Sequence, residues 1–339
     1  METRFYLVQN CREPRMQTLS MEKRKLSGRA ATMKSSFKRR ENMSNPIISG
    51  YYADPDIRYF EGRYYIYPTT DGNKWHGASF KCFSSDNLKD WTDHGEIFNI
   101  TWNSKWAKDF AWAPTVGYKN GKYYLYYCAE KNIGVAVAEH PYGPFENLSV
   151  EEPFLSMEKL ENGVTLDQVI DPYVLTDHDG RNYLYFGNSK TPAVMELEDD
   201  MRTIVSGSMK NIIYEGEADC REAFMAVYEQ GKYHFTWSCD DTRSEDYHVN
   251  YGISDSPTGP VKVLGTILHK NTEKNILGTG HHGMIKDPKT GRYLIAYHRF
   301  SHSLPEGVDG WDRGAFREIC LDWMDLSKDG LFQKVEVTE

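Results

Sequence analysis

Short apolar runs on either side of a glycine turn recur along this chain. In residues 169–188 (VIDPYVLTDHDGRNYLYFGN), an apolar run precedes an Asp-Gly turn at Gly180, and an aromatic-rich run follows it. Two such runs around an Asp-Gly turn predict a β-hairpin, because glycine adopts the positive φ of a tight turn without steric cost. We therefore predict strand, turn and strand for this stretch.

The same pattern occurs four more times, with turn glycines at Gly62, Gly121, Gly231 and Gly291. The five turn glycines are 59, 59, 51 and 60 residues apart. This period has room for four strands, and long repeats of short strands are typical of radial folds. We predict an all-β fold, a five-bladed β-propeller with four-stranded blades around a central axis. The alternative, a β-sandwich, is disfavoured because its turn signals recur about every 8–12 residues.

Equivalent positions of the repeat carry candidate chemistry. Eight or nine positions before the turn glycines lie Asp54, Ala113, Asp171, Glu222 and His282. Trp112 directly precedes Ala113, and His281 directly precedes His282. The first strand of each propeller blade lies nearest the axis, so these positions are expected to face one central pocket. Buried carboxylates cost free energy unless they are paired or functional, and their convergence indicates a site.

The first 43 residues differ from the rest in charge. They hold eleven Lys or Arg and four Asp or Glu, whereas the remainder holds 29 and 45. We predict residues 1–43 as a basic, disordered tail without the apolar core of a signal peptide, and residues 44–339 as the propeller. Met21, Met33 and Met43 are alternative start sites. The acidic body argues against nucleic acid as a partner.

Composition adds two further expectations. Aromatic residues make up 14% of the chain, and such side chains suit strands and stack on sugar faces. No apolar run reaches 18 residues, so no membrane association is expected. Without a CxxC motif, reduced thiols are expected rather than a zinc site at the six scattered cysteines, which are Cys11, Cys82, Cys128, Cys220, Cys239 and Cys320.

Five motifs follow one another along residues 45–331. They are NPIISGYYADPDI (45–57), WAP (112–114), VIDPYVLTDHDGRNYL (169–184), REAFMAVYEQGKY (221–233) and GTGHHGMI (278–285). Together they resemble glycoside hydrolase family 43. The resemblance implies a five-bladed propeller that hydrolyses arabinose- and xylose-containing plant polysaccharides with inversion.

The resemblance also implies three catalytic roles. The general base falls on Asp54, the general acid on Glu222, and a carboxyl group that tunes the acid and orients substrate on Asp171. An inverting glycosidase needs an acid for the leaving oxygen and a base for water, and a neighbouring carboxylate can raise the pKa of the acid. The family often has Glu-Gly-Pro at the acid, whereas Ala and Phe follow Glu222 here; Glu215 and Glu217 are the nearby alternatives.

Further residues are candidates for substrate or metal binding. The resemblance places His281 near the axis, where many members hold a calcium ion or a water cluster. A structural calcium is therefore the metal candidate, although calcium prefers oxygen ligands, and no cofactor is expected for the chemistry. For His281 and Trp112, core packing remains the alternative. The candidates for substrate contact are Trp75, Trp112, His282, Arg299 and Arg317.

The expected activity is that of an inverting, exo-acting α-L-arabinofuranosidase. Its expected partners are plant cell-wall oligosaccharides derived from arabinoxylan or arabinan, and its expected location is the cytoplasm. The chain lacks the C-terminal β-sandwich of many family β-xylosidases, which favours the arabinofuranosidase. The alternatives are a β-xylosidase or bifunctional enzyme, an endo-arabinanase, and a propeller that only binds carbohydrate; the intact set of Asp54, Asp171 and Glu222 disfavours the last.

Overall fold

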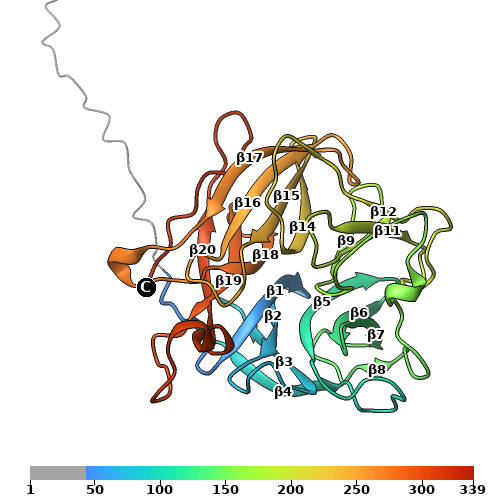
Figure 1. Ribbon diagram of the computed structural model, residues 1–339, viewed down its shortest axis with the longest axis horizontal. Coiled ribbons are helices and arrows are strands. Elements are labelled where there is room, and N and C mark those ends of the chain that lie inside the picture. Colours follow the sequence, from blue (N-terminus) through green and yellow to red (C-terminus); the bar gives the residue numbers. More distant parts are fainter. Residues whose placement is uncertain (1–42) are drawn as a thin grey trace, which may run out of the picture. The chain divides into compact units, whose positions relative to one another are not determined.

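Five small sheets form a ring around one axis, which confirms the predicted five-bladed β-propeller (Figure 1). The computed structural model describes residues 43–339. The predicted tail therefore lies outside the described residues except for Met43, which is buried in the core. Among the described residues, no helix is long and apolar enough to cross a membrane.

The blades follow one another in chain order. Blade I contains β1 (Tyr52–Phe60), β2 (Arg63–Thr70), β3 (Ser79–Ser85) and β4 (Thr92–Asn99). Blade II contains β5 (Trp112–Lys119), β6 (Lys122–Ala129), β7 (Asn132–Ala138) and β8 (Glu146–Asn147). Blade III contains β9 (Tyr173–Thr176), β10 (Asn182–Phe186), β11 (Ala193–Leu197) and β12 (Lys210–Asn211). Blade IV contains β13 (Tyr214–Glu215), β14 (Glu222–Glu229), β15 (Lys232–Cys239), β16 (His248–Ser254) and β17 (Val261–Leu268). Blade V contains β18 (Gly280–Lys286), β19 (Tyr293–Phe300) and β20 (Arg317–Met324).

Two blades depart from the predicted four strands. Blade IV has five, because the short strand β13 pairs in parallel with β17. Blade V has three, and the segment around Asn45 lies along its outer strand β20. There, the Ile47 N–H donates to the carbonyl of Ile319 over 3.0 Å, and the Asn45 side chain bonds both the N–H and the carbonyl of Leu321. The two ends of the propeller therefore meet in blade V and close the ring.

The predicted hairpins are present in every blade. All five turn glycines have positive φ, from 73° at Gly291 to 86° at Gly180. In the β1–β2 hairpin Glu61 also has positive φ, at 50°, which is the conformation of a two-residue type I′ turn. These turns lie at the ends of the inner strands, so they set where each inner strand stops.

Hydrogen bonds between neighbouring blades join the hairpin ends. In four blades a tyrosine at the start of the second strand donates to a carboxylate at the hairpin of the preceding blade. The pairs are Tyr64 with Asp287 (2.5 Å), Tyr123 with Glu61 (2.9 Å), Tyr233 with Asp177 (2.6 Å) and Tyr293 with Glu229 (2.8 Å). Burial and the carboxylate acceptors raise the pKa of these four tyrosines. The repeat thus includes a polar contact between blades as well as an apolar core.

The core lies between adjacent blades. Separate clusters of buried side chains fill the spaces between blades I and II, II and III, and V and I, and a larger cluster fills blades III to V. At the ring closure, β18 approaches β1 at backbone distance. A Cβ on Gly283 would lie 2.8 Å from the carbonyl oxygen of Pro55 and from the nitrogen of Ile57, so this position requires glycine.

A distortion of the inner strands turns their first residues toward the axis. In four blades the pairing between the first and second strands shifts register near the start, as in a β-bulge. Each inner strand has one left-handed residue there or just before it; these are Asp54 (φ 50°), Ala113 (44°), Asp171 (56°), Ala223 (56°) and His281 (37°). The count from the turn glycines predicted Glu222 and His282 at the position of the left-handed residue. In the structure this residue is Ala223 in blade IV and His281 in blade V, so the count is wrong by one residue in both. Glu222 directly precedes the left-handed residue, as Trp112 does in blade II.

Candidate active site

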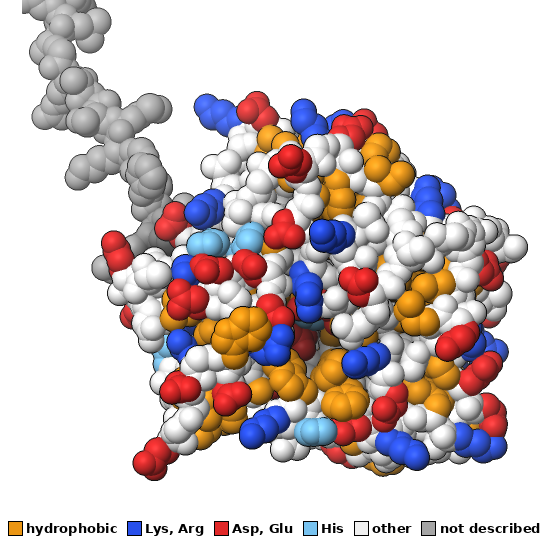
Figure 2. Space-filling view, viewed as in Figure 1, with side chains coloured by type: hydrophobic (Ala, Val, Ile, Leu, Met, Phe, Trp, Pro, Cys, Tyr) orange, Lys and Arg blue, Asp and Glu red, His pale blue; other side chains and the backbone are white. Residues whose placement is uncertain are grey.

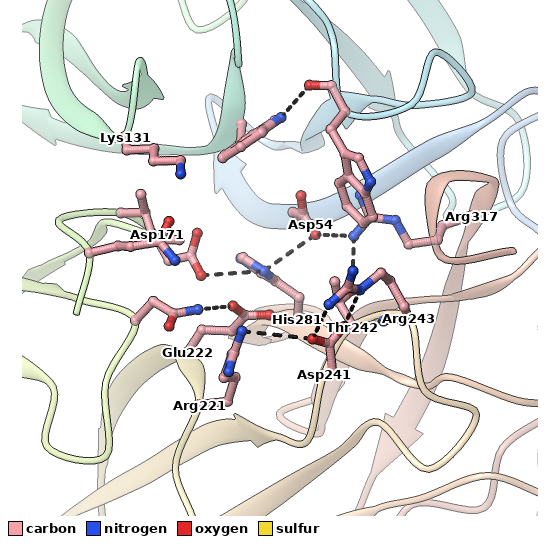
Figure 3. A pocket seen from close by; sticks show the side chains of 15 residues that line it. Asp54, Lys131, Asp171, Arg221, Glu222, Asp241, Thr242, Arg243, His281 and Arg317 are labelled. Atoms are coloured by element: carbon pink, nitrogen blue, oxygen red, sulfur yellow. Dashed lines mark hydrogen bonds and ion pairs between the residues drawn. The ribbon is translucent and has the colours of Figure 1, made fainter. Parts of the chain in front are cut away.

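One pocket opens where the inner strands of all five blades begin. Its volume is about 340 Å³, and each blade contributes at least one side chain, namely Asp54, Trp112, Asp171, Glu222 and His281 (Figure 3). Acidic, basic and hydrophobic side chains surround a hollow near the middle of the face shown in Figure 2. The convergence predicted from the repeat is therefore present in the structure.

Asp54 is buried and held by three neighbours. Its Oδ2 accepts a 2.7 Å hydrogen bond from Thr69, and its Oδ1 accepts a 3.0 Å hydrogen bond from Arg317 Nη1. Nδ1 of His281 lies 3.3 Å from the same Oδ1. Burial alone would raise the pKa of Asp54, but Arg317, His281 and His298 together hold it well below its usual range. Asp54 is therefore a carboxylate at neutral pH.

Asp171 has the opposite electrostatic environment. Its Oδ2 is buried without a hydrogen-bond partner among the described residues. Burial, followed by repulsion from Glu222 and from Asp54, raises the pKa of Asp171 well above its usual value. Because carboxylates this close cannot easily all be ionised, Asp171 retains its proton to higher pH than an ordinary aspartic acid does.

Glu222 is held in place by two neutral donors. Oε1 accepts a 2.8 Å hydrogen bond from the Tyr247 hydroxyl, and Oε2 accepts a 2.5 Å hydrogen bond from the Asn188 side-chain amide. Tyr247 is itself fully buried, and its ring stacks on His298 at a centroid distance of 5.5 Å. Glu222 therefore has a defined orientation within the pocket.

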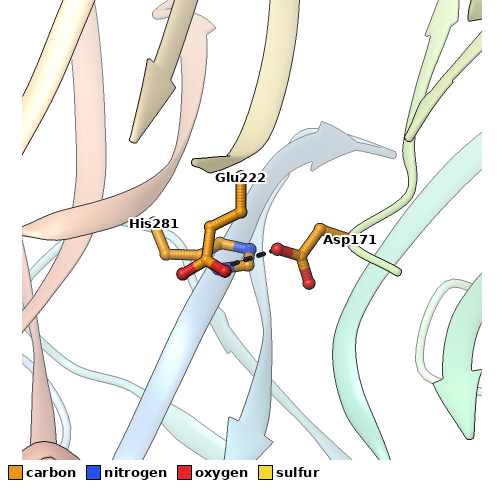
Figure 4. A group of neighbouring side chains, drawn as sticks. All are labelled: Asp171, Glu222 and His281. Atoms are coloured by element: carbon orange, nitrogen blue, oxygen red, sulfur yellow. Dashed lines mark ion pairs between the residues drawn. The ribbon is translucent and has the colours of Figure 1, made fainter. Parts of the chain in front are cut away.

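His281 lies between the carboxyl groups. Its Nδ1 is 3.3 Å from Oδ1 of Asp54. The same atom is 3.8 Å from Oδ2 of Asp171 (Figure 4). One atom each from Asp171, Glu222 and His281 lie within 4.8 Å of one another, so these three could chelate a cation. Such a cation would occupy the carboxyl groups that hydrolysis requires.

The predicted calcium requires a different set of ligands. Beneath the pocket lies a cavity of about 20 Å³, which has room for about one water molecule. Calcium takes six to eight oxygen ligands, whereas Asp56, on the wall of this cavity, is already bound by Arg58 through both of its oxygens. On the same wall, burial lowers the pKa of His282 to about 3, so its imidazole is neutral. These residues therefore do not fit a calcium ion bound by protein oxygens.

Arg317 and two tryptophans occupy the positions expected of substrate-contact residues. Arg317, at the start of β20, lies 4.9 Å from the ring centre of Trp75. The indole N–H of Trp112 donates to the carbonyl of Trp75 over 2.8 Å. All three side chains line the pocket, and Arg317 lies across it from Asp171 (Figure 3).

Two predicted substrate-contact residues lie away from the pocket. Arg299 is buried on β19 and donates to Glu318 over 2.8 Å. His282 is buried beneath the pocket, and its Nε2 lies 2.6 Å from Thr236 Oγ1. Neither prediction fits these positions, because successive residues of a strand point to opposite sides. The neighbour of Arg299, His298, is the residue that faces Asp54, with its Nδ1 at 3.1 Å.

The structure also separates Glu222 from the alternative acids. Glu215 and Glu217 are exposed and lie outside the pocket lining. Several residues that the sequence analysis missed do contribute to the site. Asn188 and Tyr247 hold Glu222, Thr69 holds Asp54, and basic side chains line the pocket at Lys131, Arg221 and Arg243. Most of these come from loops or second strands, where the repeat gave no signal. Arg221 lay within a recognised motif, and Asn188 ended the stretch of residues 169–188.

Comparisons with known proteins agree with this fold and site. The sequence profile of "Glycosyl hydrolases family 43" matches residues 43–332. The chain is 33% identical over 309 residues to the β-D-galactofuranosidase xynD of Aspergillus niger, covering 87% of this chain and 85% of that protein. It is 30% identical over 341 residues to xylosidase/arabinosidase 43A of Humicola insolens, covering 82% and 96%.

A solved structure shows the same relationship. The α-L-arabinofuranosidase of Clostridium thermocellum superposes with a TM-score of 0.70 at 32% identity, covering 84% of this chain and 94% of that one. The protein therefore belongs to glycoside hydrolase family 43 and is a hydrolase of glycosidic bonds.

Proposed function

We propose that this protein is an inverting, exo-acting α-L-arabinofuranosidase. The observation that carries this proposal is that one pocket holds a carboxyl group with a lowered pKa and another with a raised pKa. Asp54 is held ionised by Arg317, whereas Asp171, across His281 and beside Glu222, has a pKa raised well above its usual value. An inverting glycosidase needs one carboxylate to activate water and one carboxylic acid to protonate the leaving oxygen.

In the proposed mechanism, Asp54 accepts a proton from the attacking water. Glu222, oriented by Tyr247 and Asn188, gives its proton to the glycosidic oxygen as the bond breaks. The raised pKa of Asp171 keeps a proton in the pocket beside Glu222. After product release, the acid regains a proton and the base loses one to solvent, which restores the starting state.

The size of the pocket favours action at a chain end. At about 340 Å³ it lies near the lower end of the usual range for ligand pockets, about 300–1,000 Å³. This volume suits one or two sugar residues better than the middle of a polysaccharide. We therefore favour trimming of short arabinoxylan or arabinan oligosaccharides over endo-arabinanase activity.

The choice of sugar rests on the similar proteins. The names of the A. niger and C. thermocellum proteins both specify a furanosidase, whereas the H. insolens name includes xylosidase. α-L-Arabinofuranose and β-D-galactofuranose share their ring configuration and differ in the exocyclic chain. The second candidate is accordingly a β-D-galactofuranosidase, followed by a β-xylosidase or bifunctional enzyme.

A panel of nitrophenyl glycosides tests these alternatives. The proposal predicts faster release of nitrophenol from the α-L-arabinofuranoside than from the β-D-galactofuranoside or the β-D-xyloside. A higher kcat/KM on either of the other two would reassign the sugar. No release from any of the three, by folded protein, would favour a propeller that only binds carbohydrate.

We also propose the cytoplasm as the location. The five described cysteines are buried and unpaired, which a reducing compartment favours. Detection of the protein in the culture medium or in a periplasmic fraction of its source cells would overturn this assignment.

A further inference from the structure

The pocket has a basic side that hydrolysis of a neutral sugar does not require. Besides Arg317, which holds Asp54, the lining includes Lys131, Arg221 and Arg243. Acidic residues outnumber basic ones in the chain as a whole, which has a formal charge of −9. In this lining the two kinds are equal in number, because the four basic side chains accompany Asp54, Asp171, Glu222 and Asp241.

Lys131 is exposed and uncommitted. It lies in the short turn between β6 and β7, with φ at 60°, and it forms no hydrogen bond or ion pair with another described residue. The turn itself is anchored, because Glu130 Oε1 accepts a 3.0 Å hydrogen bond from the backbone N–H of Asp109. The ammonium group is therefore presented to the pocket from a fixed backbone.

Arg221 and Arg243 share a single carboxylate. Arg243 binds Asp241 through two 2.7 Å hydrogen bonds and lies 4.6 Å from the ring centre of Trp311. Arg221 reaches the same Asp241 only at 3.8 Å. The charge of Arg243 is thus balanced by Asp241, whereas the charge of Arg221 is balanced only in part.

Lys131 and Arg221 do not neutralise the proposed catalytic carboxyl groups. No described ion pair joins Lys131 or Arg221 to Asp54, Asp171 or Glu222; the cation bound to Asp54 is Arg317. In Figure 3, Lys131 and Arg221 lie on either side of Asp171 and come from blades II and IV. They are placed to bind an anionic group that enters with the substrate.

We propose that the leaving-group side of this pocket binds a carboxylate-bearing sugar, so that the preferred substrates are acidic oligosaccharides with a hexuronic acid beside the cleaved residue. This inference rests on the proposed glycosidase function. The guanidinium of Arg221 can bind a carboxylate through two parallel hydrogen bonds, and Lys131 adds a point charge from the opposite side. The negatively charged catalytic groups lie deeper and receive the neutral sugar.

A matched pair of substrates tests the proposal. One is a xylo-oligosaccharide with a terminal arabinofuranosyl substituent and a neighbouring glucuronic acid; the other is the same compound with its carboxyl group reduced to the alcohol. The proposal predicts a kcat/KM that is higher for the acidic form by about two- to fivefold per charge contact, the size typical of partly exposed ion pairs. The ratio should fall toward one as salt is added, because salt screens exposed charges.

Three variants locate the effect. Lys131→Gln and Arg221→Gln should each lower the ratio of acidic to reduced substrate, again by about two- to fivefold. Lys328→Gln removes the same charge from an exposed residue outside the pocket lining and should leave the ratio unchanged. A general effect of a substitution on folding or turnover changes kcat/KM for both substrates alike, so it cancels in the ratio of acidic to reduced substrate.

The outcomes are distinguishable from failure of the proposed function. If the aryl glycosides and the reduced oligosaccharide are cleaved but the wild-type ratio is one or lower, the acidic-substrate inference is wrong and the glycosidase assignment stands. The inference also fails if the ratio exceeds one but persists in both pocket variants. If no glycoside is cleaved, the proposed function itself fails.

Discussion

Nη1 of Arg317 donates a 3.0 Å hydrogen bond to Oδ1 of Asp54, although the two residues are 263 positions apart in the sequence. They belong to the last and first strands of the propeller, β20 and β1, which closure of the ring brings together. Asp71 accepts from both the backbone N–H and Nε of Arg317 and so fixes the guanidinium. The ionised state of the proposed base thus depends on closure of the ring.

Replacement of Arg317 should change the pH dependence of activity. Asp54 must be ionised to act as a base, and Arg317 is one of the groups that keep its pKa low. In Arg317→Met, burial remains while this charge is lost, so the pKa rises. The acidic limb of the kcat/KM profile should move to higher pH by about 1–3 units, the usual effect of an adjacent arginine.

Arg299→Met provides the matched control for that experiment. Arg299 is equally buried but pairs with Glu318 outside the pocket. This variant should lose stability without moving the acidic limb. An unchanged limb in Arg317→Met, measured on folded protein, would mean that another group sets the ionisation of Asp54.

Asp171→Asn should move the other limb. The substitution keeps the shape of the side chain but removes the carboxyl group whose pKa is raised by burial and by repulsion from Glu222 and Asp54. We expect a lower kcat and a basic limb shifted to lower pH, measured as kcat/KM against pH. A basic limb that stays in place would show that Asp171 orients substrate without contributing to protonation.

Glu222→Ala should show a dependence on the leaving group. General acid catalysis is worth about 10² to 10⁴ in rate and matters most for a basic leaving oxygen. The variant should therefore lose most activity on an arabino-oligosaccharide but retain much of it on a dinitrophenyl glycoside. Asp54→Ala should reduce both alike, because both reactions need activated water.

Glu217→Ala is the control for this comparison, since Glu217 is exposed and outside the pocket lining. It should behave as wild type with both substrates. Equal losses with both substrates in Glu222→Ala, or a leaving-group dependence in Asp171→Asn instead, would move the acid role away from Glu222.

The tyrosine contacts between blades should contribute to stability. Tyr64→Phe removes a 2.5 Å hydrogen bond to buried Asp287 and should lower the free energy of unfolding by about 1.5–3 kcal/mol, as expected for a bond to a charged group. Tyr183→Phe is the matched control. Tyr183 is a buried tyrosine near the start of β10 in blade III, and its hydroxyl has no hydrogen bond among the described contacts. Equal losses in denaturant titrations of both variants would show that the hydroxyl contact adds nothing.

Much of the architecture could be predicted because it depends on local turns. Each hairpin needs a glycine with positive φ, so five such glycines at a steady interval revealed five blades. The strand count of blade V could not be obtained this way. Its outer edge is covered by the segment around Asn45, some 276 positions from its partner Leu321, and no local pattern signals that contact.

The site was predictable to within one residue. A bulge near the start of the inner strand sets which residue faces the pocket, and a count from the turn glycine does not detect it. This explains why His281 rather than His282 lines the pocket. Glu222 lines the pocket as predicted, although it lies one residue before the left-handed position of its blade. The prediction of Arg299 as a substrate contact failed for a similar reason. Neighbouring residues of a strand face opposite sides, and the sequence alone did not show that His298 is the one that faces the pocket.

The stereochemistry of the first product tests the central claim most directly. If Asp54 activates water while Glu222 protonates the leaving oxygen from the other face, the anomeric configuration must invert. Proton NMR during the first minutes of hydrolysis, before mutarotation, should show the β-anomer of arabinose released from an α-L-arabinofuranoside. Initial appearance of the α-anomer would show retention, which requires a carboxylate to act as a nucleophile and contradicts the roles assigned to Asp54 and Glu222.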